Sequence, residues 1–477
     1  MRKAMALSAM LFILAGAGRG QTMSYPINVS NSIHDSRWAQ CAFGPDSVLH
    51  IIWQEAYIGR SGSDILYVSY DGKAFSTPFK LKDSPDVHAE RPNIAVNSKG
   101  VIAAVWDSQK DIWCRIFDPV SRTWLPAERV SSDWEDRADE PSVAVDSFGN
   151  VYVFYYTGDA WVRSRINGFW DSSYRLNHPG ARSQHGYIAA AADDTIWVMW
   201  IEKGDDDNYK TWYSRRTKDT AWRALADVNA AAGQSQAVPH FAFGKDNMPR
   251  VVWMHEFQRS VGAHWEIEIV MCTVDERVNP TEVITPSGLM HFPRIAMDSD
   301  DRPHVAIQDG PGDWGSGILY TTKRGGAWST LYNFPKSFGF PKLPGISADG
   351  FGNVAVIWAA HDTTPQQEVW LSTLYPITPK NYLPPTNARA NISLQGLRSR
   401  PQVRYDLSWD RNPENADAFL SGYDIYVKTG SGSWTLLQTV SNSTFTLTLT
   451  YADVSVKRKF GIRTRSMSGA LSDLVEF

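Results

Sequence analysis

Charged and aromatic residues recur beside short apolar segments along the chain, at intervals of about 50 residues. One group precedes these segments: Arg37, Trp38, Glu90, Arg91, Asp139, His185 and His291. A second group follows them: Glu55, Asp107, Tyr156, Glu202, His255, Glu256, Asp309, His361 and Asp362. Tryptophan can stack on a sugar face, while arginine and carboxylates bond sugar hydroxyl or acid groups. Two carboxylates about 5 to 10 Å apart could also hydrolyse a glycosidic bond.

These residues form a site only if the fold brings them together. The alternative is that strand ends are polar because they meet water, with acids and arginines pairing between neighbouring strands. A shared site for a small ligand requires Arg37, Arg91, His255 and Glu256 to converge within about the width of a sugar.

The apolar segments are seven copies of one fifteen-residue unit, which begin at Ala39, Pro92, Pro141, Gly186, Pro239, Pro293 and Pro344. Their starts are 53, 49, 45, 53, 54 and 51 residues apart, a period typical of solenoids and propellers. The fourth position is Ala in six copies and Ser in the seventh, as expected for close packing against a neighbouring sheet. The ninth is Gly, Asn or Asp in six copies, which favours the positive φ of a tight hairpin.

A third aromatic-bearing run follows every unit, and a fourth closes most of them. Four strands per repeat predict the blades of a β-propeller. The seventh unit lacks a fourth strand, whereas "YPINVSNSIHD" from Tyr25 resembles the fourth strands of other repeats. We therefore predict an all-β fold in which a seven-bladed propeller is closed by the N-terminal strand.

The domain organisation follows from shifts in this pattern. Residues 1–20 combine Arg2 and Lys3 with an apolar run and small residues, which predicts a signal peptide. Residues 21–376 form the expected propeller, and residues 377–384 are a Pro-rich linker. Residues 385–477 resemble a fibronectin type III domain, with "PP" at the start and Trp409, Tyr423 and Phe460 as strand anchors.

Charge and composition limit the partners. Without residues 1–20 the chain has 44 basic and 51 acidic residues, so we expect no nucleic-acid partner. No other segment is apolar enough to span a bilayer. We expect a monomer that is secreted, extracellular or periplasmic.

Cofactors are not expected. Cys41, Cys114 and Cys272 lie in apolar runs and are predicted to be buried structural thiols, and His50 and His304 to be packing residues. The loop "KGDDDNYK" from Lys203 could hold calcium through its three acids, but it lacks the spacing of a defined calcium loop, so a solvated hairpin is favoured.

The segment "SYDGKAF", Ser69 to Phe75, resembles the Asp-box turn of the sialidase-like superfamily. With "AVDSFGNVYV", it makes the ring similar to a secreted sialidase-like propeller of the BNR type. The resemblance implies a structural role for Asp71. It does not carry sialidase activity over, because sialidases have six blades and Arg37, Arg91 and Arg294 do not map onto their arginine triad. Some seven-bladed polysaccharide lyases use a His and a Tyr beside a uronate, a pair that His185 and Tyr187, or His255 and Tyr156, could imitate.

Our prediction is an exported protein that binds extracellular glycan or protein through the propeller mouth, with the fibronectin type III module as spacer or adhesion unit. The alternative is a carbohydrate-active enzyme, either a sialidase-like glycoside hydrolase or a uronate-polysaccharide lyase, that works at the same mouth.

Overall fold

Every regular element that the structure describes is a β-strand, as predicted. The structure is a computed structural model that describes residues 23–83, 88–132, 137–203, 209–223, 226–228, 235–257, 266–274, 281–286, 288, 290–310, 316–335, 339–361, 365–374, 377, 383–413, 415, 420–466 and 471–477. Within these ranges there is no helix long and apolar enough to cross a membrane. The expected signal peptide lies outside them.

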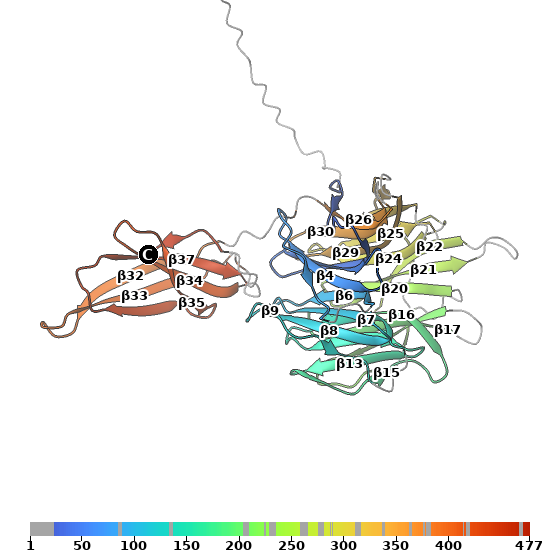
Figure 1. The fold of residues 1–477 in the computed structure, drawn as a ribbon, viewed down its shortest axis with the longest axis horizontal. Coiled ribbons are helices and arrows are strands. Elements are labelled where there is room, and N and C mark those ends of the chain that lie inside the picture. Colours follow the sequence, from blue (N-terminus) through green and yellow to red (C-terminus); the bar gives the residue numbers. More distant parts are fainter. Residues whose placement is uncertain are drawn as a thin grey trace, which may run out of the picture.

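Seven antiparallel sheets follow one another along residues 27–374 (Figure 1). Sheet 1 orders β2 (Asp35–Phe43), β3 (Leu49–Ala56), β4 (Ser63–Tyr70) and β5 (Phe79–Lys80). Sheet 2 orders β6 (Glu90–Val96), β7 (Ile102–Ser108), β8 (Asp111–Asp118) and β10 (Glu128–Arg129), with β9 (Thr123–Trp124) also paired to β8. Sheet 3 orders β11 (Asp139–Val145), β12 (Val151–Tyr156), β13 (Ala160–Ile166) and β14 (Phe169–Trp170), with β15 (Tyr174–Arg175) paired to β13.

The remaining four sheets repeat this order. Sheet 4 contains β16 (Arg182–Ala190), β17 (Ile196–Lys203), β18 (Tyr209–Arg216) and β19 (Ala226–Asp227). Sheet 5 contains β20 (Ser235–Phe243), β21 (Pro249–Phe257), β22 (Glu266–Thr273) and β23 (Glu282–Val283). Sheet 6 contains β24 (Met290–Met297), β25 (Pro303–Asp309), β26 (Gly317–Arg324) and β27 (Ala327–Trp328), with β28 (Tyr332–Asn333) paired to β26. Sheet 7 contains β29 (Gly339–Ala348), β30 (Val354–His361), β31 (Gln367–Leu374) and β1 (Ile27–Asn28).

The seven sheets close into a propeller-like ring. The first strand of each sheet contacts the first strand of the next, and β29 of sheet 7 contacts β2 of sheet 1. The N-terminal strand pairs with β31 as predicted, with Ile27 opposite Leu371 and Asn28 opposite Trp370. This pairing covers the outer edge of β31 with a strand from the other end of the ring.

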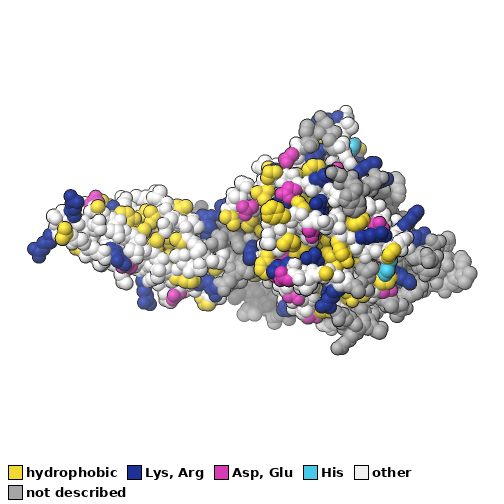
Figure 2. All heavy atoms as spheres, turned by 90° about the horizontal axis from the view of Figure 1, so that it is seen from below, with side chains coloured by type: hydrophobic (Ala, Val, Ile, Leu, Met, Phe, Trp, Pro, Cys, Tyr) yellow, Lys and Arg dark blue, Asp and Glu magenta, His cyan; other side chains and the backbone are white. Residues whose placement is uncertain are grey.

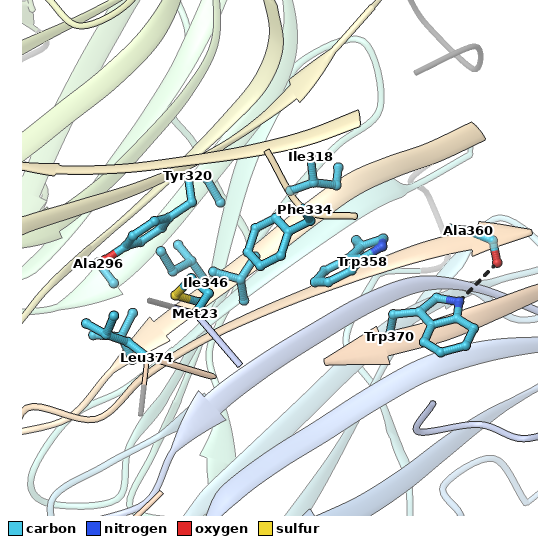
Figure 3. Close-up of a cluster of buried hydrophobic side chains, with 13 residues drawn as sticks. Met23, Ala296, Ile318, Tyr320, Phe334, Ile346, Trp358, Ala360, Trp370 and Leu374 are labelled. Atoms are coloured by element: carbon cyan, nitrogen blue, oxygen red, sulfur yellow. Dashed lines mark hydrogen bonds between the residues drawn. The ribbon is translucent and has the colours of Figure 1, made fainter. Parts of the chain in front are cut away.

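The repeat determines where the core lies. Its fifteenth residue is Trp53, Trp106, Tyr155, Trp200, Trp253, Ile307 or Trp358, and each of these side chains is at most 1% exposed. Between sheets 6 and 7, Trp358 packs with Phe334, Tyr320 and Met23 (Figure 3). The ninth residue of every unit has a positive φ, from 59° at Asn247 to 86° at Gly149 and Gly352, so the predicted hairpins are confirmed.

Residues 386–476 form two further sheets, which lie beside the ring as a separate body in Figures 1 and 2. One sheet orders β32 (Thr386–Gln395), β33 (Gln402–Asp410) and β36 (Thr446–Tyr451). The other orders β35 (Thr435–Ser441), β34 (Leu420–Thr429), β37 (Arg458–Ser466) and β38 (Val475–Glu476). The predicted anchors Trp409, Tyr423 and Phe460 lie in one buried cluster of this body.

Candidate functional site

A β-bulge interrupts the first strand of every sheet at the same place. The residue immediately before each unit adopts a left-handed conformation, and the register of the ladder shifts there. These seven bulge residues are Trp38, Arg91, Glu140, His185, Val238, Phe292 and Leu343, with φ between 37° and 54°. A left-handed conformation costs a non-glycine residue about 1 to 2 kcal/mol, and such strain clusters at functional sites.

All seven bulge residues line one cavity of about 370 Å³, in which the first strands of all seven sheets meet. Its wall is uneven. Arg91, Glu140 and His185 come from consecutive sheets and form a polar arc, whereas Val238, Phe292 and Leu343 form an apolar arc on the next three. Trp38 stands between the two arcs. The cavity volume lies near the lower end of the range for small-molecule sites, about 300 to 1,000 Å³.

A second tier of polar side chains lies two residues further along these strands: Gln40, Asn93, Ser142, Tyr187, His240 and Arg294. Three of them accept a hydrogen bond from a backbone N–H of the following sheet. Asn93 Oδ1 accepts from Val143, Ser142 Oγ from Ile188 and His240 Nδ1 from Ile295, each at 3.2 Å. These bonds leave the Asn93 amide, the Ser142 hydroxyl and the His240 Nε2–H as donors at the cavity.

Glu140 and His185 form a carboxylate–imidazole pair. The Nδ1 atom of His185 lies 2.8 Å from Oε2 of Glu140. Burial would raise the pKa of Glu140, but the hydrogen bond from His185 and the positive charges of His185, Arg91 and Arg294 hold it below its usual value. In the neutral form of His185, the ionised carboxylate accepts the Nδ1 proton, which places the lone pair of the ring on Nε2, where it can act as a base.

Arg294 is a cation without a carboxylate partner. Its Nη1 donates to the carbonyl oxygen of Pro293 at 3.1 Å, and no carboxylate of the described residues lies within 4.0 Å of its guanidinium. Burial lowers its pKa, which the neighbouring Tyr187 and Glu140 partly oppose. The side chain is partly buried, and a partly desolvated charge without a carboxylate partner is unfavourable. Arg294 therefore marks a place that an anion can occupy.

Tyr187 lies beside this cation. Its ring centre is 4.0 Å from that of His240. Burial raises the pKa of Tyr187, while the charge of Arg294 opposes the rise. The phenol therefore stays protonated at neutral pH and can donate a proton or a hydrogen bond into the cavity.

Arg91 is, by contrast, a neutralised cation. It forms ion pairs with Asp139 and, at 3.4 Å, with Asp107, and its guanidinium lies 5.8 Å from the ring centre of Trp38. Burial raises the pKa of Asp107 to about 7, although the charge of Arg91 opposes the rise. These groups belong to a smaller cleft beside the cavity, to which Glu90 also contributes.

The predicted site residues do not all lie at one place in the structure. Trp38, Arg91 and His185 line the cavity, and Glu90, Asp107 and Asp139 line the neighbouring cleft. Of the four residues expected to converge, only Arg91 lines the cavity, so a site built from Arg37, Arg91, His255 and Glu256 is not supported. Arg37 instead pairs with Asp35.

Glu55 and Glu202 have carboxylates that face into the protein. Glu55 accepts hydrogen bonds from Ser36 at 2.7 Å and from the indole of Trp53 at 2.9 Å. Glu202 accepts from the indole of Trp200 at 2.8 Å and contacts Nδ1 of His178 at 2.8 Å. We therefore correct the prediction for both residues: they anchor the buried tryptophans at the ends of β3 and β17.

The other candidates lie outside the cavity. His255 bonds Glu268 across β21 and β22 at 3.0 Å, Asp309 accepts from Ser316 at 2.7 Å, and His361 lies 3.4 Å from Gln367. Tyr156 stands opposite Asp139 in the ladder. Burial raises the pKa of Glu256 and lowers that of His291. Asp362 lies outside the described residues.

Several structural predictions are confirmed. All three cysteines are buried and free, and burial raises the pKa of Cys41 to about 12. His304 is fully buried and bonds the hydroxyl of Tyr320 at 2.6 Å. Asp71 accepts the backbone N–H groups of Lys73 and Ala74 at 2.8 Å, as the Asp-box resemblance implies. The prediction of a solvated hairpin in the acidic loop is not tested, because residues 204–208 lie outside the described ranges.

Sequence reasoning missed most of the second tier and the pattern of bulges. The bulge residues share no side-chain type, so only their place before the unit could have identified them. The second position of the unit is polar in six copies, which is unusual for a strand at the centre of a ring, and this was the available signal.

Comparisons with known proteins find likeness of structure only. No family model and no curated protein matches the chain. A fungal alcohol oxidase of the AA5 family, in complex with copper, has a TM-score of 0.51 at 9% identity, over 96% of this chain and 99% of that one. The GH93 α-L-arabinofuranosidase of Fusarium graminearum has a TM-score of 0.44 at 11% identity, over 74% and 97%. A polysaccharide lyase of family PL25, an ulvan lyase, has a TM-score of 0.48 at 9% identity, over 71% and 94%. The structural neighbours thus include carbohydrate-active enzymes, and identities this low concern the fold alone.

Proposed function

We propose that the cavity lined by the seven bulge residues, here called the axial cavity, binds the carboxylate of an acidic glycan, and that the protein cleaves the glycan chain there by β-elimination, as a uronate-polysaccharide lyase. One observation carries the proposal: Arg294, which has no carboxylate partner among the described residues, lines the same cavity as Tyr187 and the Glu140–His185 pair. This is the alternative that the sequence left open, and it is preferred here to binding alone.

Arg294 is the residue proposed to hold the substrate carboxylate. A guanidinium can bind a carboxylate through two parallel hydrogen bonds. The donors at Asn93, Ser142 and His240 add neutral hydrogen bonds to sugar hydroxyls. Binding an anion would supply the counter-ion that Arg294 lacks within the described protein.

The proposed reaction uses the two remaining groups. Nε2 of His185 removes the proton on the carbon next to the carboxylate, and Arg294 stabilises the negative charge that develops on the carboxyl oxygens. The electron pair forms a carbon–carbon double bond as the glycosidic C–O bond breaks. Tyr187 donates its proton to the leaving oxygen and is reprotonated from solvent, while His185 releases its proton to solvent.

The glycoside hydrolase alternative is less well supported. Hydrolysis usually needs two carboxylates on either side of the scissile bond. Among the described residues that line the cavity, Glu140 is the carboxylate, and His185 engages it. The described cavity wall therefore offers an imidazole and a phenol in place of the second acid.

The test is the absorbance of unsaturated uronate released from a panel of uronate polysaccharides. We expect turnover by the unmodified protein and a loss of about 10² to 10⁴-fold in kcat for His185→Ala and for Tyr187→Phe. His255→Ala and Glu256→Gln are controls on β21, outside the cavity, and should retain activity. Binding of these glycans with no turnover would instead support the binding protein first predicted.

We infer further that the seven sheets are the blades of a seven-bladed propeller spanning residues 21–376. The ring contacts and the pairing of β1 with β31 support this inference. We propose that residues 385–477 are a fibronectin type III domain, supported by sheets of three and four strands around Trp409 and Tyr423. Export and a monomeric state are part of the same proposal, which secretion assays and light scattering can check.

A further inference from the structure

A charged cleft of about 150 Å³ adjoins the axial cavity between sheets 2 and 3. Its lining residues are His88, Glu90, Arg91, Asp107, Gln109, Lys110, Arg137, Ala138 and Asp139. Arg91 lines both the cleft and the cavity. The two spaces therefore meet at this side chain, and a ligand that leaves the cavity past Arg91 enters the cleft.

The backbone around the cleft is unusual for its residue types. Gln109, Lys110 and Arg137 have φ values of 52°, 76° and 62°, and Arg91 has 47°. A two-residue hairpin turn of this kind favours Asn and Gly, which are absent at Gln109 and Lys110. Four left-handed residues without glycine around one small cleft are the kind of strain that is retained at binding sites.

The connection between the second and third strands is also shorter in sheet 2 than in any other sheet of the ring. Two residues connect the second and third strands of sheet 2, from Ser108 to Asp111. Six residues make the same connection in sheet 1, from Ala56 to Ser63, and eight make it in sheet 5. Because the turn at Gln109 and Lys110 is short, a long ligand chain can leave the cavity here without crossing a long loop.

The charges of the cleft differ from those of the cavity. Arg91 is paired with Asp107 and Asp139. Together with Lys110, Arg137 and Glu90, the cleft has three basic and three acidic residues, so its formal charge is zero with His88 neutral. Paired ions offer both donors and acceptors, which suits the hydroxyl groups of a neutral sugar. A cleft without net formal charge offers a second carboxylate no surplus cation, unlike the cavity with Arg294.

We infer that the cavity and the cleft together bind a chain in which an acidic sugar is followed by a neutral one. The uronate lies at Arg294, and the neutral sugar lies beyond Arg91 against Gln109, Lys110 and Arg137. This inference rests on the acidic-glycan function proposed above, and it extends that function from one sugar to an ordered pair.

The test measures affinity against chain length by calorimetry, with Tyr187→Phe as background so that ligand is not consumed. The probes are a uronate monosaccharide, the uronate–neutral disaccharide of an alternating polysaccharide and the disaccharide of a pure polyuronate. We expect the uronate–neutral disaccharide to bind about tenfold tighter than the uronate monosaccharide, since two added hydrogen bonds of about 0.7 kcal/mol each give that factor. The pure polyuronate should show no such gain.

Arg137→Ala should remove this gain and leave the affinity for the monosaccharide unchanged. The matched control is Arg122→Ala, which replaces an exposed arginine of sheet 2 with φ of 56° that lies outside the cleft. Equal affinity for both lengths, an equal gain with the polyuronate, or a gain that survives Arg137→Ala would overturn the inference alone. Absence of binding to every uronate probe would overturn the acidic-glycan function as well.

Discussion

Two sets of polar residues at the strand ends of the ring have different roles. Those at the start of the innermost strands, such as His185 and Arg294, line a shared cavity and keep hydrogen-bonding capacity unused. Those at the end of the second strands, such as Glu55 and Glu202, are at most 5% exposed and bonded to buried indoles. The difference teaches that, in this ring, similar residue types serve as site or as scaffold according to which strand end carries them.

The largest effect should come from removing the unpaired cation. Arg294→Ala is expected to lower kcat/KM on uronate polysaccharide by about 10² to 10³-fold, because a charge that stabilises the developing anion is lost. Stability should be unchanged or higher, since a partly buried charge without a carboxylate partner is removed. Turnover and urea unfolding of the same preparation check both halves. A variant that keeps full activity but unfolds more easily would show that Arg294 has a structural role only.

The opposite pattern is expected on the scaffold side. Glu202→Ala should lower the free energy of unfolding by about 2 to 3 kcal/mol, because it leaves the Trp200 indole and His178 without their partner. The kcat of the folded fraction should not change. Urea unfolding measures the loss, and Glu256→Gln, outside this hydrogen-bond set, serves as the control. Loss of activity without loss of stability would show instead that Glu202 takes part in the functional site.

The pH dependence of stability should test whether the pKa of Asp107, in the cleft beside the cavity, is raised in the folded protein. The folded pKa of Asp107, about 7, lies above the value of about 4 for an unfolded aspartate. Between these values the folded state binds more protons, so this group lowers stability as the pH rises from 4 to 7. Asp107→Asn should remove about 2 kcal/mol of that decline, as measured by denaturant unfolding at several pH values. An unchanged pH slope would contradict the assignment.

The smallest effect is expected at a hairpin away from the cavity. Gly149→Ala keeps open space around the added carbon, whose nearest neighbour lies at 3.8 Å, but places Ala at a φ of 86°. A cost of about 1 kcal/mol in stability and no change in turnover should follow. Thermal unfolding and the uronate assay check this. A large loss of turnover would show that the hairpins take part in the site.

The scaffold was largely predictable from the sequence because each repeat marks its own structure. The buried fifteenth residue and the positive φ at the ninth both follow from residue type, and the N-terminal pairing follows from the missing strand. Glu55 and Glu202 could not be assigned, because their bonding to Trp53 and Trp200 depends on side-chain direction at the strand end. The bulge at His185 was also hidden, since Trp, Arg, Glu, His, Val, Phe and Leu share no property that signals a left-handed backbone.

The most direct test of the central claim is whether Arg294 recognises a carboxylate. Calorimetric titration with a uronate oligosaccharide and with its carboxyl-reduced counterpart compares two ligands that differ mainly in this charge. We predict that the unmodified protein binds the acidic ligand at least about tenfold tighter, a difference of about 1.4 kcal/mol, and that Arg294→Ala binds both equally. Equal binding of both ligands by the unmodified protein would contradict the account.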